Sequence, residues 1–261
     1  MRKNKTKAKL KRGEIAVGHF VLEFDTPGIG QMMANAGCEF AIFDMEHSNF
    51  TIESIRRSII SAKAADLTAL VRVPYSEYFL MSRALDAGAE GLMIPWVETR
   101  DQTLKIVESM KYPPVGKRGA AFGIAHDDYK GGDVAEAVQQ ANEETLVIVQ
   151  TETAKAVENV DQILSVEGVD VAWIGQCDMS ISLGIPGQYD HPKFLKAFDK
   201  VLNACEKYGV ALGFLPLDVP DAMKMIDRGA RCIAYSADVF LFSQALKADI
   251  QEIHEHIEKR G

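Results

Sequence analysis

Residues 146–174 read LVIVQTETAKAVENVDQILSVEGVDVAWI, and their pattern indicates the fold class. The segment opens and closes with short apolar runs, Leu146–Thr151 and Val171–Ile174, each of a length typical of a buried strand. The amphipathic stretch between them, Ala154–Leu164, has the length and spacing of a helix. A strand, a helix and a second strand in this order predict two parallel strands joined by a helical crossover.

The same alternation continues along the whole chain. The other expected strands are Ala16–Leu22, Phe40–Asp44, Thr68–Val73, Gly91–Pro95, Ala211–Phe214 and Cys232–Ser236. Further helices are expected at Ile52–Ala65, Thr99–Lys111, Phe194–Tyr208 and Val219–Arg228. Several helical patterns end at a glycine in the position of a helix C-cap, namely Gly37, Gly88, Gly209 and Gly229. Eight strands that alternate with helices predict an α/β fold, a single (β/α)8 TIM barrel.

The composition fits one ordinary globular domain, with 47% hydrophobic and 25% charged residues over 261 positions. No linker rich in Pro, Ser or Gly divides the chain. The formal net charge of -8 argues against a nucleic-acid partner, because an acidic surface repels phosphates. No stretch approaches the roughly 18 apolar residues of a membrane span, so no membrane partner is expected.

Four cysteines are scattered along the chain, at Cys38, Cys177, Cys205 and Cys232. They form no CxxC pair and no export signal is recognisable, which argues against a disulfide framework or a zinc knuckle. A reducing, cytoplasmic location is therefore expected.

Two segments stand apart from the strand and helix pattern. Residues 1–12 hold seven Lys or Arg and no acid, which predicts a solvated, partly disordered basic tail, or a weak contact with an anionic surface, before a barrel domain at 13–261. Residues 112–132, YPPVGKRGAAFGIAHDDYKGG, form an unusually long connection. Long loops in compact domains are often functional, so this one is expected to line an active site or contact another subunit, against a plain surface excursion.

Ionisable residues collect where the expected strands end, which is where this fold carries its catalytic residues. Glu152 follows the fifth strand and Asp178 follows the sixth. Carboxylates without Cys or His in the same segments suit a hard cation such as Mg²⁺ or Mn²⁺. A 2-oxo acid could chelate such a metal, which would then stabilise an enolate as a Lewis acid. The alternative is that each acid only favours the dipole of the helix that follows it.

Three further residues are candidates for the chemistry. Arg72 ends the third strand and offers a permanently charged fork for carboxylate or enolate oxygens, with a surface ion pair as the alternative. His47 follows Asp44 and Glu46 after the second strand and could act as a general base, although a lone histidine is often structural. Asp86 opposes the dipole of its helix just before Gly88, so it either orients a histidine or is an exposed helix-end acid.

Several chemistries are disfavoured by what the sequence lacks. No lysine lies in the expected strands, so a Schiff-base aldolase would have no nucleophile. No G-x-S-x-G, Walker or dinucleotide-binding motif is present, and no Gly-rich phosphate cradle follows the eighth strand. Phosphorylated substrates are therefore not favoured.

These residues resemble the HpcH/HpaI aldolases from about Gly18 to Leu246. The resemblance is carried by FDMEHSNF (43–50), LVRVP (70–74), LDAGAEGLMIPWVET (85–99), KYPPVGKRG (111–119), VQTETAKAVENVDQIL (149–164), VEGVDVAWIGQCDMSISLG (166–184) and HP (191–192). It implies a barrel of the phosphoenolpyruvate/pyruvate type whose eighth helix is exchanged between neighbours. We therefore expect a homo-oligomer, a hexamer or a trimer.

The resemblance also implies a role for each candidate residue. A divalent metal, Mg²⁺, Mn²⁺ or Co²⁺, would be held by Glu152 and Asp178; His47 would be the acid-base residue, with its basicity raised by Asp86; Arg72 would stabilise the enolate. Asp44 would be a second polar partner beside His47. The 2-oxo acid would contact Gln150 and the backbone of Gly175, Cys177 and Asp178.

One departure from the family pattern concerns the turn before Asp178. Relatives commonly have G-P-A-D-L-S or G-P-G-D-L where this chain has Gly175-Gln176-Cys177-Asp178-Met179-Ser180. The loss of the stiffening proline predicts a changed affinity for the 2-oxo acid. Cys177 is interpreted as a small side chain at an alanine position, with a redox sensor as the alternative.

The expected last helix, Asp238–Lys259, carries an apolar stripe of Phe242, Leu246, Ile250, Ile253 and Ile257. One chain does not say whether this stripe covers its own barrel or that of a neighbour.

The function predicted from the sequence is reversible cleavage of a 4-hydroxy-2-oxo acid to pyruvate, or a close analogue, and an aldehyde. Two kinds of alternative stay open at this point. One is related enolate chemistry, as in an oxaloacetate decarboxylase or a CoA-ester lyase. The other is a 2-oxo-acid binding protein without catalytic activity.

Overall fold

The computed structural model describes residues 1–260 and contains one closed barrel of eight parallel strands in the order β1 to β8. The strands are β1 (Ala16–Val21), β2 (Phe40–Asp44), β3 (Thr68–Arg72), β4 (Gly91–Ile94), β5 (Leu146–Thr151), β6 (Val171–Ile174), β7 (Ala211–Phe214) and β8 (Cys232–Ala237). All eight expected strands are confirmed, with ends that differ by a residue or less. The predicted (β/α)8 barrel is therefore correct.

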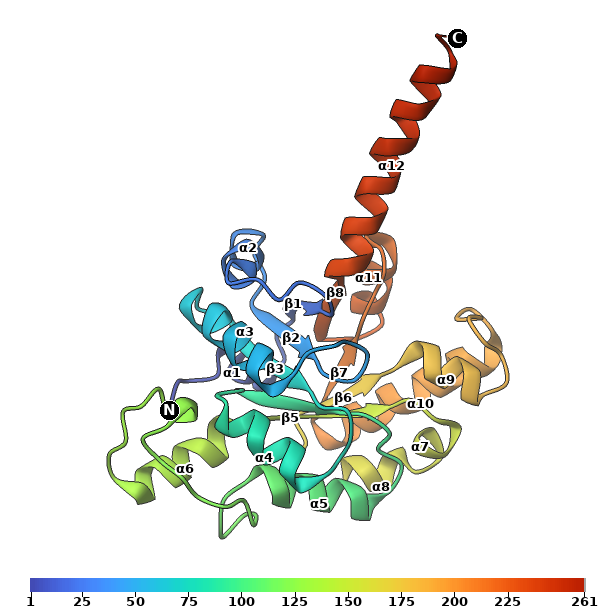
Figure 1. Cartoon of the computed structure of the whole chain (residues 1–261). Helices are drawn as coiled ribbons and strands as arrows, with labels where there is room; N and C mark the ends of the chain where they lie inside the picture. Colours follow the sequence, from blue (N-terminus) through green and yellow to red (C-terminus); the bar gives the residue numbers. More distant parts are fainter. Residues whose placement is uncertain (261) are drawn as a thin grey trace.

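Helices alternate with the strands and surround most of the barrel (Figure 1). They are α1 (Lys5–Lys11), α2 (Ile29–Asn35), α3 (Ile52–Ala64), α4 (Tyr78–Asp86), α5 (Arg100–Met110), α6 (Val134–Glu144), α7 (Ala154–Glu158), α8 (Val160–Leu164), α9 (Gln176–Ser182), α10 (Pro192–Tyr208), α11 (Val219–Asp227) and α12 (Asp238–Glu258), with a 3-10 turn at Ala125–Asp127. The helix expected at Ala154–Leu164 is divided at Asn159 into α7 and α8. The four glycines expected at helix ends all have positive φ.

Alternate side chains of each strand point into and out of the barrel, which produces two hydrophobic cores. The inner core contains Phe20, Ile42, Leu70, Met93 and Ile148 among its members. The larger outer core lies between the strands and the surrounding helices. Because the interior is filled by packed side chains, polar residues of the strands can meet a ligand only where the strands end.

The structure contradicts the expectation that residues 1–12 form a solvated, partly disordered tail, because most of them form helix α1. Helix α1 lies across the end of the barrel where the strands begin, and its Leu10 is buried in the inner core. Lys9 pairs with Glu39 at 2.6 Å and Lys7 pairs with Asp170 at 2.8 Å. These acids directly precede β2 and β6, so they face the helix. Lys7 and Lys9 therefore neutralise acids at the strand starts, while Lys3, Lys5, Lys11 and Arg12 stay exposed to solvent.

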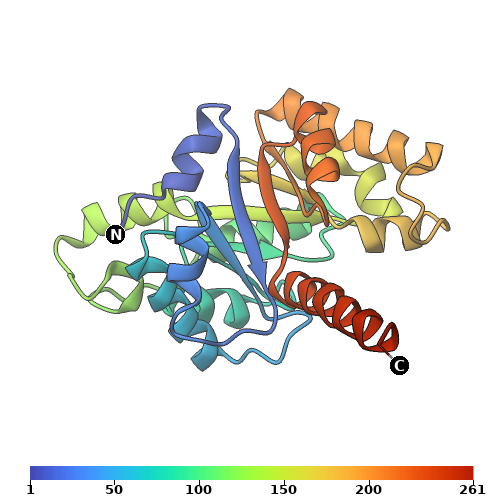
Figure 2. The same cartoon turned by 90° about the horizontal axis from the view of Figure 1, so that it is seen from above.

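Helix α12 extends away from the body of the barrel (Figures 1 and 2). Its predicted stripe, from Phe242 to Ile257, is exposed to solvent in the single chain. On β1, the side chain of Val17 is 38% exposed. The described chain thus exposes the apolar stripe of α12 and one apolar residue of β1 at the same time. No helix among residues 1–260 has the length and apolar character needed to cross a membrane.

The long connection at residues 112–132 is folded tightly against the outside of the barrel. Tyr112, Arg118 and His126 are buried within it. Arg118 stacks on the Tyr112 ring, with 4.7 Å between its guanidinium carbon and the ring centre. The Gly119 amide donates a hydrogen bond to the Tyr78 hydroxyl of α4 at 2.8 Å. The loop is therefore anchored to α4.

Candidate active site

Arg72 is held by Asp44 at the end of β3 where the C-terminal ends of the strands meet. The two residues are partners in the register of β2 and β3. Nε and Nη2 of Arg72 each donate to one carboxylate oxygen of Asp44 at 2.7 Å, and Nη1 lies 3.2 Å from Oε2 of Glu46. The guanidinium also stacks on the Phe20 ring, with 5.1 Å to the ring centre. Because the side chain is only 12% exposed, the alternative of a surface ion pair does not apply.

Asp44 lies behind Arg72. Its carboxylate accepts two further hydrogen bonds, from the backbone amides of Glu46 at 2.9 Å and His47 at 3.1 Å. With a fully buried side chain and four donors, Asp44 fixes both the guanidinium and the 44–47 turn. Its contribution is to position Arg72 and His47.

Glu152 is clamped at the end of β5 by donors from two directions. The Trp96 amide donates to Oε1 at 2.6 Å, and the Gln150 side-chain amide donates to Oε2 at 2.6 Å. A Cβ on Gly175, which precedes α9, would lie only 2.8 Å from the Cβ of Glu152. Residue 175 is therefore restricted to glycine if Glu152 is to keep this orientation.

Three carboxylates repel one another at this point. Burial raises the pKa of Glu152 to about 7, and the charges of Glu46 and Asp178 act in the same direction. Burial also raises the pKa of Glu46 to about 7, opposed by Arg72 and supported by Asp44 and Asp178. Arg72, the guanidinium beside these carboxylates, is already paired with Asp44. The cluster therefore has a surplus of negative charge and fits a cation.

Two orphaned acceptors support the same conclusion. Oε2 of Glu46 and Oε1 of Gln150 are buried without a hydrogen-bond partner, although the Glu46 oxygen does form its ion pair with Arg72. Within residues 1–260 no three His, Cys, Asp or Glu side chains are arranged as a complete ligand set. Mg²⁺ in enzymes often takes only one or two carboxylates and completes its shell with water and substrate oxygens. The donor set fits a hard divalent cation of this type.

His47 stands at the open edge of the site with its side chain 60% exposed. Its nearest charged neighbour is Glu46, with 3.8 Å between Nε2 of the ring and Oε2 of the carboxylate. In the described part of the chain no hydrogen bond orients the ring. The imidazole is thus accessible to substrate and lacks the partner that the sequence analysis expected.

Asp86 is not that partner within one chain. It ends α4, which leads to the N-terminal end of β4, whereas His47 follows the C-terminal end of β2. Asp86 pairs with buried Arg118 of the 112–132 loop, with 2.5 Å between Oδ1 and Nη2. The structure therefore brings Arg72, His47, Glu152 and Asp178 together and places Asp86 elsewhere.

The altered turn before Asp178 is fastened by a side chain. Nε2 of Gln176 donates to the carbonyl of Leu215, just after β7, at 2.6 Å. This bond links the start of α9 to the next strand and takes over part of the stiffening expected from proline. The first hydrogen bond within α9 joins the Met179 amide to the Gly175 carbonyl, so the amides of Cys177 and Asp178 remain at the helix start. Cys177 is exposed beside them.

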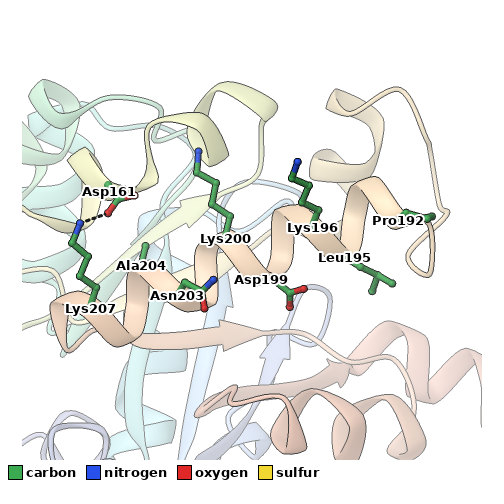
Figure 3. A pocket seen from close by; sticks show the side chains of 9 residues that line it. All are labelled: Asp161, Pro192, Leu195, Lys196, Asp199, Lys200, Asn203, Ala204 and Lys207. Atoms are coloured by element: carbon green, nitrogen blue, oxygen red, sulfur yellow. Dashed lines mark hydrogen bonds and ion pairs between the residues drawn. The ribbon is translucent and has the colours of Figure 1, made fainter.

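A separate groove of about 660 Å³ lies on the outside of the barrel, along α10 (Figure 3). Lys207 forms an ion pair with Asp161 of α8 there, at 2.7 Å, and Lys196 and Lys200 also line the groove. None of the residues that line this groove belongs to the strand ends described above. It is not part of the candidate active site.

Two site residues were missed by the sequence analysis. Glu46 was noted only as a neighbour of His47, yet its carboxylate points toward Arg72 and has a strongly raised pKa. Its position between Asp44 and His47 in the sequence could have indicated that Glu46 also belongs to the site. Trp96 contributes its backbone amide, which donates to Glu152. Because every residue type except proline has such an amide, the sequence does not predict this contact.

The chain is similar to known proteins over most of its length. A sequence model described as HpcH/HpaI aldolase/citrate lyase matches residues 20–245. The 2-keto-3-deoxy-L-rhamnonate aldolase of Klebsiella pneumoniae is 32% identical, over 93% of this chain and 90% of its own length. The hydroxypyruvate/pyruvate aldolase of Roseobacter denitrificans is also 32% identical, over 90% of this chain and 91% of its own. A crystal structure of an HpcH/HpaI aldolase from Desulfitobacterium hafniense superposes with a TM-score of 0.92 at 36% identity, covering 95% of this chain and 96% of that one.

Proposed function

Because the chain belongs to the HpcH/HpaI aldolase/citrate lyase family, we propose that it is a divalent-metal-dependent aldolase. Its substrate would be a 4-hydroxy-2-oxo acid, which it would cleave reversibly to pyruvate, or a close analogue, and an aldehyde. The observation that carries this proposal is the crowding of Glu46, Glu152 and Asp178 around a guanidinium already paired with Asp44. Such a cluster can hold both a cation and an anionic substrate.

Glu152 and Asp178 would hold the metal, Mg²⁺, Mn²⁺ or Co²⁺. When bound, such a metal supplies Lewis-acid stabilisation of developing negative charge on the 2-oxo acid. Gln150 would keep Glu152 in place through its Nε2 and could offer its unpaired Oε1 to a bound water. The amides at the start of α9 would contact the substrate carboxylate. The orientation of these groups is set before the substrate arrives.

The chain's own residues account for the proton and electron movements. His47 takes the proton of the C4 hydroxyl, whose oxygen becomes the aldehyde carbonyl as the C3–C4 bond breaks. The electron pair of that bond passes to the 2-oxo acid fragment and forms an enolate next to Arg72. Return of the proton to C3 gives the methyl group of pyruvate. Asp44 keeps the guanidinium in place throughout, because Nε and Nη2 of Arg72 both donate to it.

An oligomer would supply what the single chain lacks. The exposed stripe of α12 and the exposed side chain of Val17 on β1 are both apolar, so α12 of one subunit would cover β1 of another. A homo-oligomer, a hexamer or a trimer, would follow from this exchange. In such an assembly Asp86 would act on the His47 of a neighbouring subunit, since the two residues lie at different ends of their own barrel.

The test is a retro-aldol screen of 4-hydroxy-2-oxo acids with metal-free protein and with added Mg²⁺, Mn²⁺ or Co²⁺, following pyruvate release. We expect activity only with metal, and full activity without metal would refute the mechanism. In deuterated water, an Arg72→Ala variant should lose exchange of the pyruvate methyl protons. Binding of pyruvate or oxalate without turnover of any substrate would instead favour a binding protein.

A further inference from the structure

The backbone of Trp96 has an unusual conformation beside the candidate metal ligand. Trp96 follows β4 and Pro95, and its φ is +56°, in the left-handed region. Residues with a Cβ avoid this region, and tryptophan has none of the local hydrogen-bonding capacity that lets Asn or Asp adopt it. Non-glycine residues in such conformations concentrate at functional sites, where the surrounding structure holds them in place.

Packing of the indole does not account for this conformation. Trp96 lies just after β4 and is 47% exposed. Its ring takes part in none of the aromatic pairs found among the described residues, in contrast to Trp173, which packs edge-on against Phe20 at 5.8 Å. A residue with a half-exposed side chain and no aromatic partner gains little packing from an unfavourable backbone angle. The cause therefore has to be sought in the backbone itself.

The backbone amide of Trp96 has a specific acceptor. It donates to Oε1 of Glu152 at 2.6 Å, and this bond lowers the pKa of a carboxyl that burial and neighbouring acids raise. Gln150 holds the other oxygen, Oε2, which packs closely over Gly175. Without the Trp96 bond, Oε1 would have no donor among the described residues, and the carboxylate could turn about its last torsion.

We propose that Trp96 is a positioning residue whose left-handed backbone aims its amide at Glu152 and fixes the orientation in which this carboxylate meets the metal. The inference rests on the proposed function, because it concerns the same metal site. It assigns the role to the main chain at position 96 and not to the indole. The outer-shell partners of metal ligands generally set ligand orientation in this way.

Two substitutions separate the main chain from the side chain. Trp96→Gly removes the indole but adopts positive φ without cost, so the amide stays on Glu152. Trp96→Val also removes the indole, but its branched Cβ disfavours positive φ and turns the amide away. The measurement is Mn²⁺ affinity of the full-length protein from the electron paramagnetic resonance signal of free Mn²⁺. Thermal unfolding in parallel identifies the temperature range in which each variant is folded.

We expect Trp96→Gly to bind Mn²⁺ within about twofold of wild type and Trp96→Val to bind roughly 10-fold to 100-fold more weakly. If both variants lose affinity equally, the indole matters and the proposal is wrong. If Trp96→Val binds as well as wild type, the amide does not position the ligand. Should the valine variant fail to fold, the α-hydroxy acid analogue of tryptophan at position 96 keeps the indole and replaces the N–H by an ester oxygen. Wild-type affinity in that ester protein would overturn the proposal.

The wild-type protein and a Glu152→Gln variant separate this proposal from the proposed function. We expect wild type to bind Mn²⁺ and Glu152→Gln to lose it. Absence of Mn²⁺ binding in wild type would refute the metal-dependent function itself. Binding that needs Glu152 but is unchanged in both Trp96→Val and the ester protein would refute only the role of Trp96.

Discussion

Arg72 and Asp44 form a bidentate ion pair. Nε and Nη2 of the guanidinium each lie 2.7 Å from a different carboxylate oxygen of Asp44, whose side chain is fully buried. Their strands are direct neighbours, and the two residues are opposite one another in the register. The third nitrogen, Nη1, faces Glu46 and the site. Asp44 therefore determines which edge of the guanidinium a substrate would meet.

An Asp44→Asn substitution should release Arg72. We expect a loss of about 3 kcal/mol in the free energy of unfolding, because one partner of a buried ion pair is removed. We also expect a fall of roughly 100-fold in kcat/KM, because a misplaced guanidinium no longer meets the developing charge. Urea unfolding and steady-state pyruvate release measure the two effects.

The matched control is Asp161→Asn, which breaks the exposed pair between Asp161 and Lys207. Solvent screens such a pair, so its loss should cost less than about 1 kcal/mol and leave kcat/KM unchanged. If Asp44→Asn behaved like Asp161→Asn, Arg72 would not depend on Asp44.

The strands could be predicted from the sequence because apolar runs such as Leu146–Thr151 are bounded by helical patterns of a different period. The ends of those strands then predicted where Arg72, Glu152 and Asp178 lie. The pairing of Asp44 with Arg72 could not be predicted, since the register between strands 28 residues apart is a tertiary property. The same applies to Trp96, whose left-handed backbone and bond to Glu152 have no sequence signal.

Helix α1 was misinterpreted for a related reason. A run of Lys and Arg resembles a solvated tail when its partners are unknown. Those partners, Glu39 and Asp170, are single acids far apart in the sequence that come together only when the barrel closes. The composition therefore predicted the charge of this segment correctly, but it did not predict the acids that pair with Lys7 and Lys9.

The stripe on α12 predicts an effect of charge on assembly. An Ile250→Asp substitution places a carboxylate in the middle of the exposed apolar row, where it would be buried if α12 covers a neighbouring barrel. We expect the oligomer to dissociate, as measured by size-exclusion chromatography with light scattering. Ala248→Asp, on the opposite side of the helix, adds the same charge and should leave the oligomer intact. Equal behaviour of the two variants would argue against the exchange of α12.

Lys111 predicts a pH dependence of stability at the end of the barrel covered by α1. Burial lowers its pKa to about 7, and Lys7 nearby acts in the same direction. The unfolded chain, with an ordinary lysine pKa, binds more protons than the folded one between pH 7 and about 10.5, so unfolding free energy should rise with pH in that window. From pH 7 to pH 9 we expect a gain of about 2 kcal/mol from this group.

Urea unfolding of wild type and a Lys111→Met variant at both pH values isolates that contribution. The variant lacks the titrating amine, so its unfolding free energy should rise less than that of wild type by the same amount. If the unfolding free energy of both proteins changed equally with pH, the pKa of Lys111 would not be lowered by folding and the prediction would be wrong.

The positions of His47 and Asp86 predict complementation between subunits. A His47→Ala variant should be inactive because it lacks the acid-base residue, and an Asp86→Asn variant should lose roughly 100-fold in kcat. Each chain then keeps the residue that the other lacks. In a mixed oligomer, a subunit with intact His47 can meet a neighbour with intact Asp86.

Hetero-oligomers made by co-expression with two different affinity tags provide the measurement. If Asp86 acts on the neighbour's His47, random mixing should restore about a quarter of wild-type activity, because both residues of a contact must come from the appropriate chain. If the two residues acted within one chain, no mixture could restore activity, since no chain carries both. Mixing His47→Ala with Arg72→Ala is the matched control: both residues belong to one barrel rim, so these hetero-oligomers should stay inactive. No activity in the test mixture would show that Asp86 does not serve a neighbouring site. Activity in the control would show that His47 and Arg72 do not act from the same chain.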